Sequence, residues 1–207
     1  MPGEWSDPAR VAEYLSREIP HRGLAEEMLL AALPGQIDRF LDLGTGDGRL
    51  LKLIHGQHPN AAAVGLDSSE PMLSRAGQQF ETHSNIELRM HDLRLPLGEV
   101  GKVQAIVSGL AIHHLTDERK RSLFAEVNAL LVPGGVFANL DLVAAPSRLH
   151  ERFRREIGRV EDDPSDHLAE LSAQIEWLRE AGFAEVDCHF KWLELALIVA
   201  VKDRASI

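Results

Sequence analysis

The chain has 207 residues, of which 44% are hydrophobic, and its 32 acidic and 22 basic side chains give a net charge of −10. This composition is typical of a globular domain with a substantial core, and it excludes a disordered chain. An acidic chain without a basic face is not typical of a nucleic-acid binder, and the longest apolar stretch, 192–201, contains Glu194 and is too short for a membrane span.

Helical and strand patterns alternate through most of the chain. The patterns and their boundary residues predict helices over 8–19, 22–33, 47–57, 70–82 and 116–131. Strands are expected over 39–43, 62–67, 86–90, 103–108 and 136–143, with Pro133-Gly134-Gly135 as a turn. The strand at 103–108 is mostly apolar, so we expect it at the centre of the sheet.

The order of elements changes after residue 143. Helices are predicted over 146–160 and 166–181, and two near-adjacent strands over 184–190 and 193–201 should pair antiparallel. Five strand–helix repeats followed by a strand pair predict an α/β fold, a doubly wound and mostly parallel sheet with one antiparallel strand.

The run Asp42-Leu43-Gly44-Thr45-Gly46-Asp47-Gly48 joins a buried strand to a new helix. Glycines let the backbone approach a ligand closely, and the helix N-terminus offers unpaired N–H groups, so the turn is typical of a nucleotide-cofactor site. Asp42, however, would repel a pyrophosphate, whereas it would attract an ammonium group. The turn therefore favours S-adenosylmethionine, which is cationic at nitrogen and sulfur, over NAD.

Two further carboxylates follow strand ends. Asp67 lies about 20 residues after the glycines, the usual distance for an acid that binds ribose hydroxyls. Asp92 can accept from an adenine amine, the amide of Leu93 can donate to a ring nitrogen, and Met72 can cover the adenine face. Because the carboxyl ends of parallel strands meet at one edge of a sheet, we expect these residues in one cofactor site.

Taken together, these motifs resemble the class I S-adenosylmethionine-dependent methyltransferases. The matching pieces are 41–48, Gly65-Leu66-Asp67 with 69–73, His91-Asp92-Leu93, 107–115, 131–135 and 178–183. The resemblance covers about residues 36–201. It implies a Rossmann-like sheet of seven strands with the last antiparallel, helices on both faces, and one domain over 1–207 with a helical cap at 1–35 and a substrate cover at 144–170.

The resemblance also implies roles for individual residues. Asp42, Gly44 and Gly46, with Thr45 between them, would hold the methionine end of the cofactor, and Asp67 followed by Ser68 would hold the ribose. Asp92 and Leu93 would hold the adenine, while Ser108 and Gly109 would line the wall near the sulfonium. The product would be S-adenosylhomocysteine.

On the acceptor side, His113 and His114 follow the fourth strand beside the expected methyl group. A histidine there can accept a proton from the nucleophile, and Asp141 can orient it or bind a cationic acceptor. We expect no metal, because adjacent residues of a regular strand point in different directions and because Ser108 stands where metal-dependent relatives have an aspartate.

We therefore predict a cytoplasmic methyltransferase that acts on a small-molecule O or N acceptor, since Cys188 is the only cysteine and the first residues lack a signal pattern. We also allow for a homodimer formed through the N-terminal helices. Three alternatives stay open: a carboxy-S-adenosylmethionine synthase-like enzyme, an NAD(P)-dependent oxidoreductase, and a non-catalytic S-adenosylmethionine-binding protein.

Overall fold

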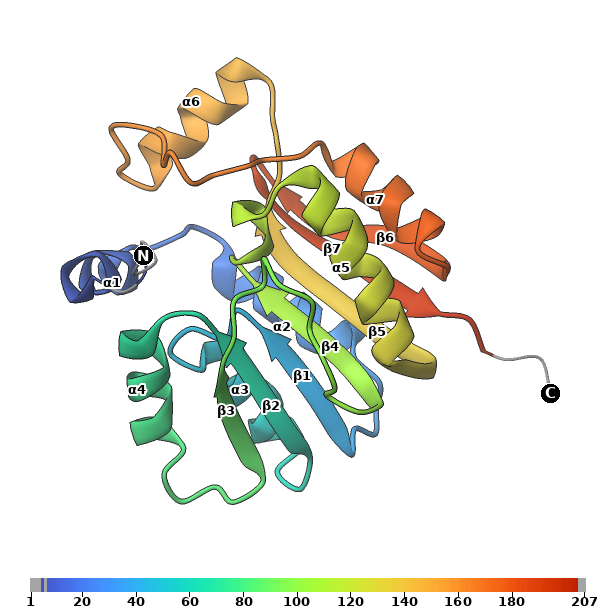
Figure 1. Ribbon diagram of the computed structural model, residues 1–207. Coiled ribbons are helices and arrows are strands. Elements are labelled where there is room, and N and C mark those ends of the chain that lie inside the picture. The colour runs from blue at the N-terminus through green and yellow to red at the C-terminus, as the bar shows by residue number, and fades with distance from the viewer. Residues whose placement is uncertain (1–4, 6, 205–207) are drawn as a thin grey trace.

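A seven-stranded sheet forms the centre of the protein in the computed structural model, which describes residues 5 and 7–204. The strand order is β3-β2-β1-β4-β5-β7-β6 (Figure 1). β7 is antiparallel to both of its neighbours and the other pairs are parallel, as predicted. The strands are β1 (Arg39–Leu43), β2 (Ala62–Asp67), β3 (Ile86–Met90), β4 (Val103–Gly109), β5 (Leu131–Leu142), β6 (Phe183–Trp192) and β7 (Leu195–Lys202).

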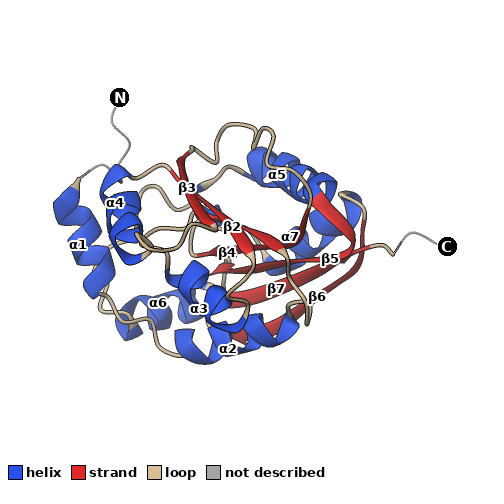
Figure 2. Cartoon of the chain, turned by 90° about the horizontal axis from the view of Figure 1, so that it is seen from below, coloured by secondary structure: helices blue, strands red, loops and turns tan. Residues whose placement is uncertain are grey.

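Helices cover both faces of the sheet. Figures 1 and 2 show α5 and α7 on one face and α2 and α3 on the other. In Figure 1, α1 and α6 lie away from both faces, towards the carboxyl ends of β1 and β4. The helices are α1 (Pro8–Ser16), α2 (Arg22–Ala32), α3 (Arg49–Gln57), α4 (Glu70–Gln79), α5 (Asp117–Leu130), α6 (Ser147–Glu156) and α7 (Leu171–Glu180), with a 3₁₀ turn, η2, at Ile112–His114. Within the described ranges, no helix combines the length and apolarity needed to cross a bilayer.

Two hydrophobic clusters fill the space between the sheet and its helices. Consecutive residues of β1 serve different clusters, because successive strand side chains point to opposite faces. Phe40 packs with Leu29 of α2 and Leu51 of α3, whereas Leu41 packs with Phe124 of α5. Each such side chain stabilises the fold by about 1.5–3 kcal/mol when fully buried.

The chain order creates a crevice between β1 and β4. After β1 the chain moves outward through β2 to β3, and it then returns to place β4 on the other side of β1. At such a switch point the connections leave in opposite directions, so the carboxyl ends of the two strands flank an open space. This is the edge at which the sequence predicts the site.

Three local predictions were wrong. β5 starts at Leu131, so Pro133-Gly134-Gly135 lies within the strand, where Gly134 has a φ of +75° and the register shifts opposite Val103 and Ala105. The connection 91–102 between β3 and β4 contains no helix, so the strand–helix alternation is less regular than expected. α7 starts at Leu171 rather than at 166, because the backbone just before it pairs with other segments: the N–H of His167 donates to the carbonyl of His113, and the carbonyl of Ala169 accepts from Ala144.

Candidate active site

Three neighbouring cavities occupy the carboxyl edge of the sheet. The inner cavity, about 260 Å³, is bordered by Gly44, Asp67, Met72 and Leu93, among others. The side cavity, about 340 Å³, lies beside Asp42. The outer cavity, about 670 Å³, lies between α1 and residues 157–164. Tyr14 lines all three, so they meet around its ring.

The glycine turn separates the inner cavity from the side cavity. Gly44, Gly46 and Gly48 all have positive φ, at +69°, +57° and +86°, which delays the start of α3 to Arg49. A Cβ on Gly44 would lie 2.2 Å from Cβ of Ala111, whereas a Cβ on Gly46 would meet no atom within 4 Å. The backbone at Gly46 therefore faces open space in both cavities, which suits a bound ligand.

Asp42 is a buried carboxyl with one unsatisfied oxygen. Its Oδ2 accepts a 2.7 Å hydrogen bond from Oγ1 of Thr45, while its Oδ1 has no hydrogen-bond partner among the residues that the structure describes. Burial, followed by the charge of Asp67, raises the pKa of Asp42 to about 7, and the Thr45 hydrogen bond opposes that rise. An ammonium group in the side cavity would satisfy the free oxygen and favour the charged form.

Asp67 supports the glycine turn and still has capacity for a ligand. Its Oδ2 accepts from the backbone N–H of Gly46, and its Oδ1 accepts from that of Ser69, both at 2.8 Å. A carboxylate oxygen can accept two hydrogen bonds, so each oxygen keeps one position for a ribose hydroxyl. Burial raises the pKa of Asp67 and the backbone hydrogen bonds counteract it.

The remaining residues predicted for the adenosine end line the inner cavity as well. Ser68, Met72, Asp92 and Leu93 are all among its walls. Asp92 is engaged on both oxygens by Arg94, at 2.7–3.0 Å, and this contact lowers the pKa of Asp92. A hydrogen bond from adenine to Asp92 therefore requires Arg94 to move.

Ser108 and Gly109 differ in their positions. Gly109 lines both the inner and the side cavity. Ser108 is fully buried, and its hydroxyl donates to the carbonyl of Leu43 at 2.8 Å. The hydroxyl thus ties β4 to β1, and Ser108 is absent from the walls of all three cavities.

His113 and Asp141 form a buried pair at the floor of the outer cavity. Nδ1 of His113 lies 2.5 Å from Oδ1 of Asp141, and the backbone N–H of His113 donates to Oδ2 at 2.8 Å. Burial opposes protonation of His113, but the charge and hydrogen bond of Asp141, with Asp166 further away, raise its pKa overall. Asp141 fixes the ring so that Nε2 points away from it.

His114 lies at the boundary between the inner and outer cavities and lines both. Burial, followed by the proximity of His113, lowers its pKa to about 4, so its imidazole is neutral at neutral pH. Its Nδ1 lies 3.2 Å from Oγ and 3.3 Å from the carbonyl oxygen of Ser165.

The expectation that the two histidines point apart was wrong. They lie on the 3₁₀ turn η2 and not on a strand, because Leu110 takes a left-handed conformation with a φ of +58° directly after β4. Their ring centroids are 4.0 Å apart. A 3₁₀ turn does not alternate its side chains as a strand does, so neighbouring rings can share one space.

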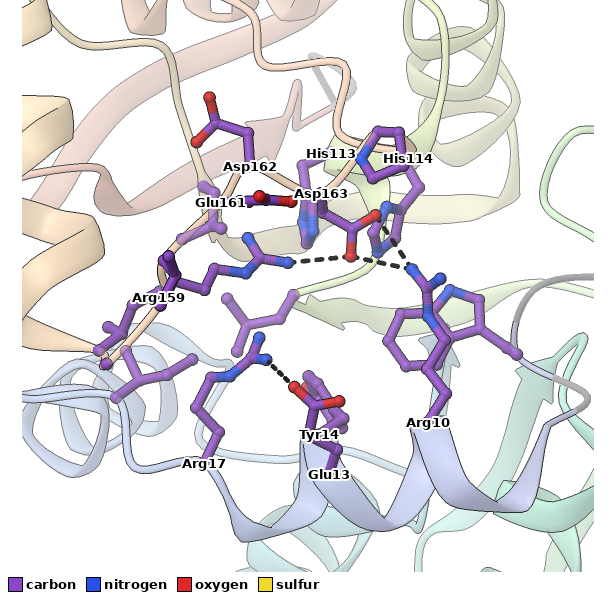
Figure 3. Close-up of a pocket in the computed structure, with 18 of the residues that line it drawn as sticks. Arg10, Glu13, Tyr14, Arg17, His113, His114, Arg159, Glu161, Asp162 and Asp163 are labelled. Carbon is purple, nitrogen blue, oxygen red and sulfur yellow. Dashed lines mark hydrogen bonds and ion pairs between the residues drawn. The ribbon is translucent and has the colours of Figure 1, made fainter.

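A set of charged residues that the sequence did not predict faces the histidines from residues 157–166. Asp163 links Arg10 of α1 to Arg159, at 2.8 and 2.9 Å (Figure 3). Burial would raise the pKa of Asp163, but the hydrogen bonds from Ser165, followed by the charges of these two arginines, lower it to about 2. Asp166 pairs with Arg159 at 3.0 Å. The spacing of these charged residues matches no helix or strand pattern, so the sequence alone did not point to them.

Aromatic side chains close the site from the N-terminal side. The ring of Trp5 lies edge-on to Tyr14 at 5.3 Å and to His114 at 5.6 Å. Oγ of Ser69 donates to the carbonyl of Trp5 at 2.6 Å, which ties this segment to the start of α4. Within the expected cap and cover segments, Arg17 lines the outer cavity and His150 pairs with Glu194 and Asp162.

Comparison with known proteins agrees with this geometry. The family described as "Methyltransferase domain" matches residues 40–135, which include the glycine turn, Asp67, Asp92 and both histidines. The match supports a class I S-adenosylmethionine-dependent methyltransferase, the family that the sequence motifs resemble. The free oxygen of Asp42, the open space at Gly46 and the spare capacity of Asp67 all fit the cofactor of this family.

Individual relatives differ in what they do. A carboxy-S-adenosyl-L-methionine synthase of Desulforapulum autotrophicum is 29% identical over 78% of this chain and 73% of its own length. A trans-aconitate 2-methyltransferase of Methylobacterium nodulans is 31% identical over 81% of this chain and 60% of its own length. Human N-acetylserotonin methyltransferase, solved with SAM, superposes with a TM-score of 0.64 at 18% identity, covering 87% of this chain. The present chain spans only 52% of that structure, so the likeness is one of fold.

Proposed function

We propose that the protein transfers the methyl group of S-adenosylmethionine to an oxygen or nitrogen of a small-molecule acceptor. The observation that carries this proposal is the junction of the cavities. Tyr14, Leu110 and His114 line both the inner and the outer cavity, so a donor in the first and an acceptor in the second would meet beside His114. The inner and side cavities would hold the cofactor through Asp42, Gly44, Thr45, Gly46, Asp67, Ser68, Met72, Asp92, Leu93 and Gly109.

The bound cofactor supplies an activated methyl group on a positive sulfur. The protein's contribution is then to position the acceptor in line and to remove its proton. The neutral imidazole of His114 can receive that proton, and Asp141 holds the neighbouring His113 in one orientation. Trp5 and Tyr14 cover the junction and exclude water from the reacting atoms.

The segments that surround the outer cavity can be assigned roles in covering the site. We propose residues 1–35 as a cap and residues 144–170 as the acceptor cover, because Arg10 of α1 and Arg159 meet at Asp163 across this cavity (Figure 3). A cytoplasmic location is part of the same proposal and rests on the single cysteine, Cys188.

A second candidate is the synthesis of carboxy-S-adenosylmethionine. It is favoured by the relative that carries this name and by three arginines in the outer cavity, Arg10, Arg17 and Arg159, whose charge suits an additional carboxylate. Arg10 and Arg159 pair with Asp163 and Arg17 pairs with Glu13, so a carboxylate would compete with these acids.

Native mass spectrometry of the purified protein tests the proposal, because tightly bound cofactor can survive purification. We expect a retained ligand with the mass of S-adenosylmethionine or S-adenosylhomocysteine. A carboxylated sulfonium would instead establish the second candidate. A nicotinamide or flavin nucleotide would overturn both.

A further inference from the structure

The side chains of His113, His114 and Asp166 converge on one point next to the outer cavity. Each offers one ligand atom, and the three atoms lie within 4.8 Å of one another. We propose that this cluster binds a divalent transition-metal ion such as Zn²⁺ and that the ion activates the acceptor. The inference rests on the proposed function and changes one step of it: with the ion bound, His114 is a ligand, and the ion replaces it in activating the acceptor oxygen.

Two of the three separations among the ligand atoms are those of ligands around a metal, and the third is at most 4.8 Å. Oδ1 of Asp166 lies 3.5 Å from Nε2 of His113 and 3.5 Å from Nδ1 of His114. A good N–H···O hydrogen bond is about 2.9 Å long, so both contacts are too long to be one. Ligand atoms about 2.1 Å from a tetrahedral ion are about 3.4 Å apart, which is close to the observed separation.

Asp166 has an oxygen that nothing in the described protein satisfies. Its Oδ2 pairs with Nη1 of Arg159 at 3.0 Å, whereas its Oδ1 is buried and has no hydrogen-bond partner. Arg159 therefore fixes the carboxylate so that the unsatisfied oxygen points towards the two rings. An unpaired buried carboxylate oxygen is costly, and a cation would remove that cost.

One of the two rings, that of His113, is already oriented for binding an ion. A histidine that ligates a metal almost always donates its other ring N–H to a carboxylate or carbonyl, which fixes the ring and makes the ligating nitrogen more basic. His113 meets this requirement, because its Nδ1 donates to Asp141 at 2.5 Å and leaves Nε2 for the ion. Nδ1 of His114 lies within hydrogen-bond distance of Oγ of Ser165 at 3.2 Å and of its carbonyl oxygen at 3.3 Å, so it must release the carbonyl contact to bind the ion.

The three ligand side chains limit which ions can bind and which kind of acceptor the ion can activate. Two imidazoles and one carboxylate suit zinc and other first-row transition metals better than Mg²⁺ or Ca²⁺, which prefer oxygen ligands. Three protein ligands leave a position open, and His113 and His114 both line the outer cavity. The acceptor would therefore bind through a hydroxyl oxygen. The ion lowers the pKa of that hydroxyl, so its proton goes to solvent. The oxygen then bonds the methyl carbon, and the electron pair of the broken S–C bond stays on sulfur.

Titration of chelator-treated, tag-free protein with Co²⁺, followed by visible absorbance, tests the site, and Zn²⁺ competition gives the affinity. We expect one ion per chain. Asp166→Asn removes the charge of a ligand, and Asp141→Asn removes the carboxylate that accepts from His113. Each substitution should weaken Co²⁺ binding by at least about tenfold. His150→Gln is the matched control, because His150 also pairs with carboxylates, Glu194 and Asp162, but lies outside the cluster. It should bind Co²⁺ as the wild type does.

Absence of an absorbance change in the wild type, or equal Co²⁺ affinity in Asp166→Asn, would overturn the metal site. If Asp166→Asn does not fold, His114→Gln makes the same test. Calorimetry with S-adenosylhomocysteine on the same metal-free samples separates this failure from that of the proposed function. Normal binding of that ligand without any metal binding would reject the ion alone, whereas failure of the wild type to bind it would reject the methyltransferase proposal.

Discussion

Lowering the pH below neutrality is expected to weaken S-adenosylmethionine binding through Asp42. The pKa of this carboxyl is raised to about 7 by burial and then by Asp67. An ammonium group beside its free Oδ1 would stabilise the carboxylate and lower that pKa. Below pH 7, Asp42 is mostly protonated in the empty protein, so each binding event must release its proton.

The size of this effect follows from the linkage of one proton to one ligand. The dissociation constant should rise about tenfold for each pH unit below 7, or about 1.4 kcal/mol per unit. Calorimetry at about pH 6, in two buffers of different ionisation enthalpy, should show release of close to one proton per ligand. Asp42→Asn cannot titrate, so its weaker binding should be much less dependent on pH over the same range. A dissociation constant in the wild type that does not change with pH would refute the reasoning.

The same carboxyl has the opposite effect on the stability of the empty protein. Its folded pKa, about 7, lies above its ordinary value of 3.8, so the folded state binds this proton more tightly than the unfolded state does. That stability is present below about pH 4 and is lost as the pH rises through about 7. At about pH 8, Asp42→Asn should therefore raise the free energy of unfolding, with on the order of 4 kcal/mol as the upper limit. Urea denaturation of both proteins measures the difference.

Three further substitutions test individual contacts. Asp67→Ala should weaken cofactor affinity at least about tenfold, since about 1.5–3 kcal/mol of charged hydrogen bonding is lost; unchanged affinity by calorimetry would reject the ribose role. His114→Ala should lower kcat far more than cofactor affinity, and an equal fall in both would indicate a structural role. Gly44→Ala should abolish cofactor binding, because its Cβ would lie 2.2 Å from that of Ala111 and its φ is +69°; a variant that binds normally would show that the turn tolerates a side chain.

The sheet could be predicted closely because its signals are local. β1 and β3 have the predicted bounds, and Ser69 and Thr116 cap α4 and α5 with side-chain hydrogen bonds to Met72 and Arg119. Apolar strand patterns and N-terminal caps depend on neighbouring residues, so they can be read from a single sequence.

The gathering of three carboxylates at one edge of the sheet could be predicted for a related reason. Asp42, Asp67 and Asp92 each follow from a strand end, and the fold brings strand ends together. The sequence could not show which of these side chains already hydrogen-bond to other residues of the protein. The hydroxyl of Ser108 donates to the carbonyl of Leu43, and the guanidinium of Arg94 donates to the carboxylate of Asp92. Neither contact can be predicted from the spacing of the residues.

The acceptor side was the least predictable. The contacts of His113 with Asp141 and of His114 with Asp166 join residues 28 and 52 positions apart. The 3₁₀ turn that places the two rings together depends on the left-handed Leu110, a conformation that is uncommon for a residue other than glycine. Tertiary packing fixes such a conformation, so it could not be predicted from the neighbouring residues.

A crystal structure with S-adenosylhomocysteine tests the central claim most directly, namely that carboxylates at successive strand ends select a cationic adenosyl ligand. The account predicts the ligand's ammonium group at Oδ1 of Asp42 and its ribose hydroxyls at Asp67. A ligand bound in the reverse orientation, or with its ammonium group away from Asp42, would contradict it.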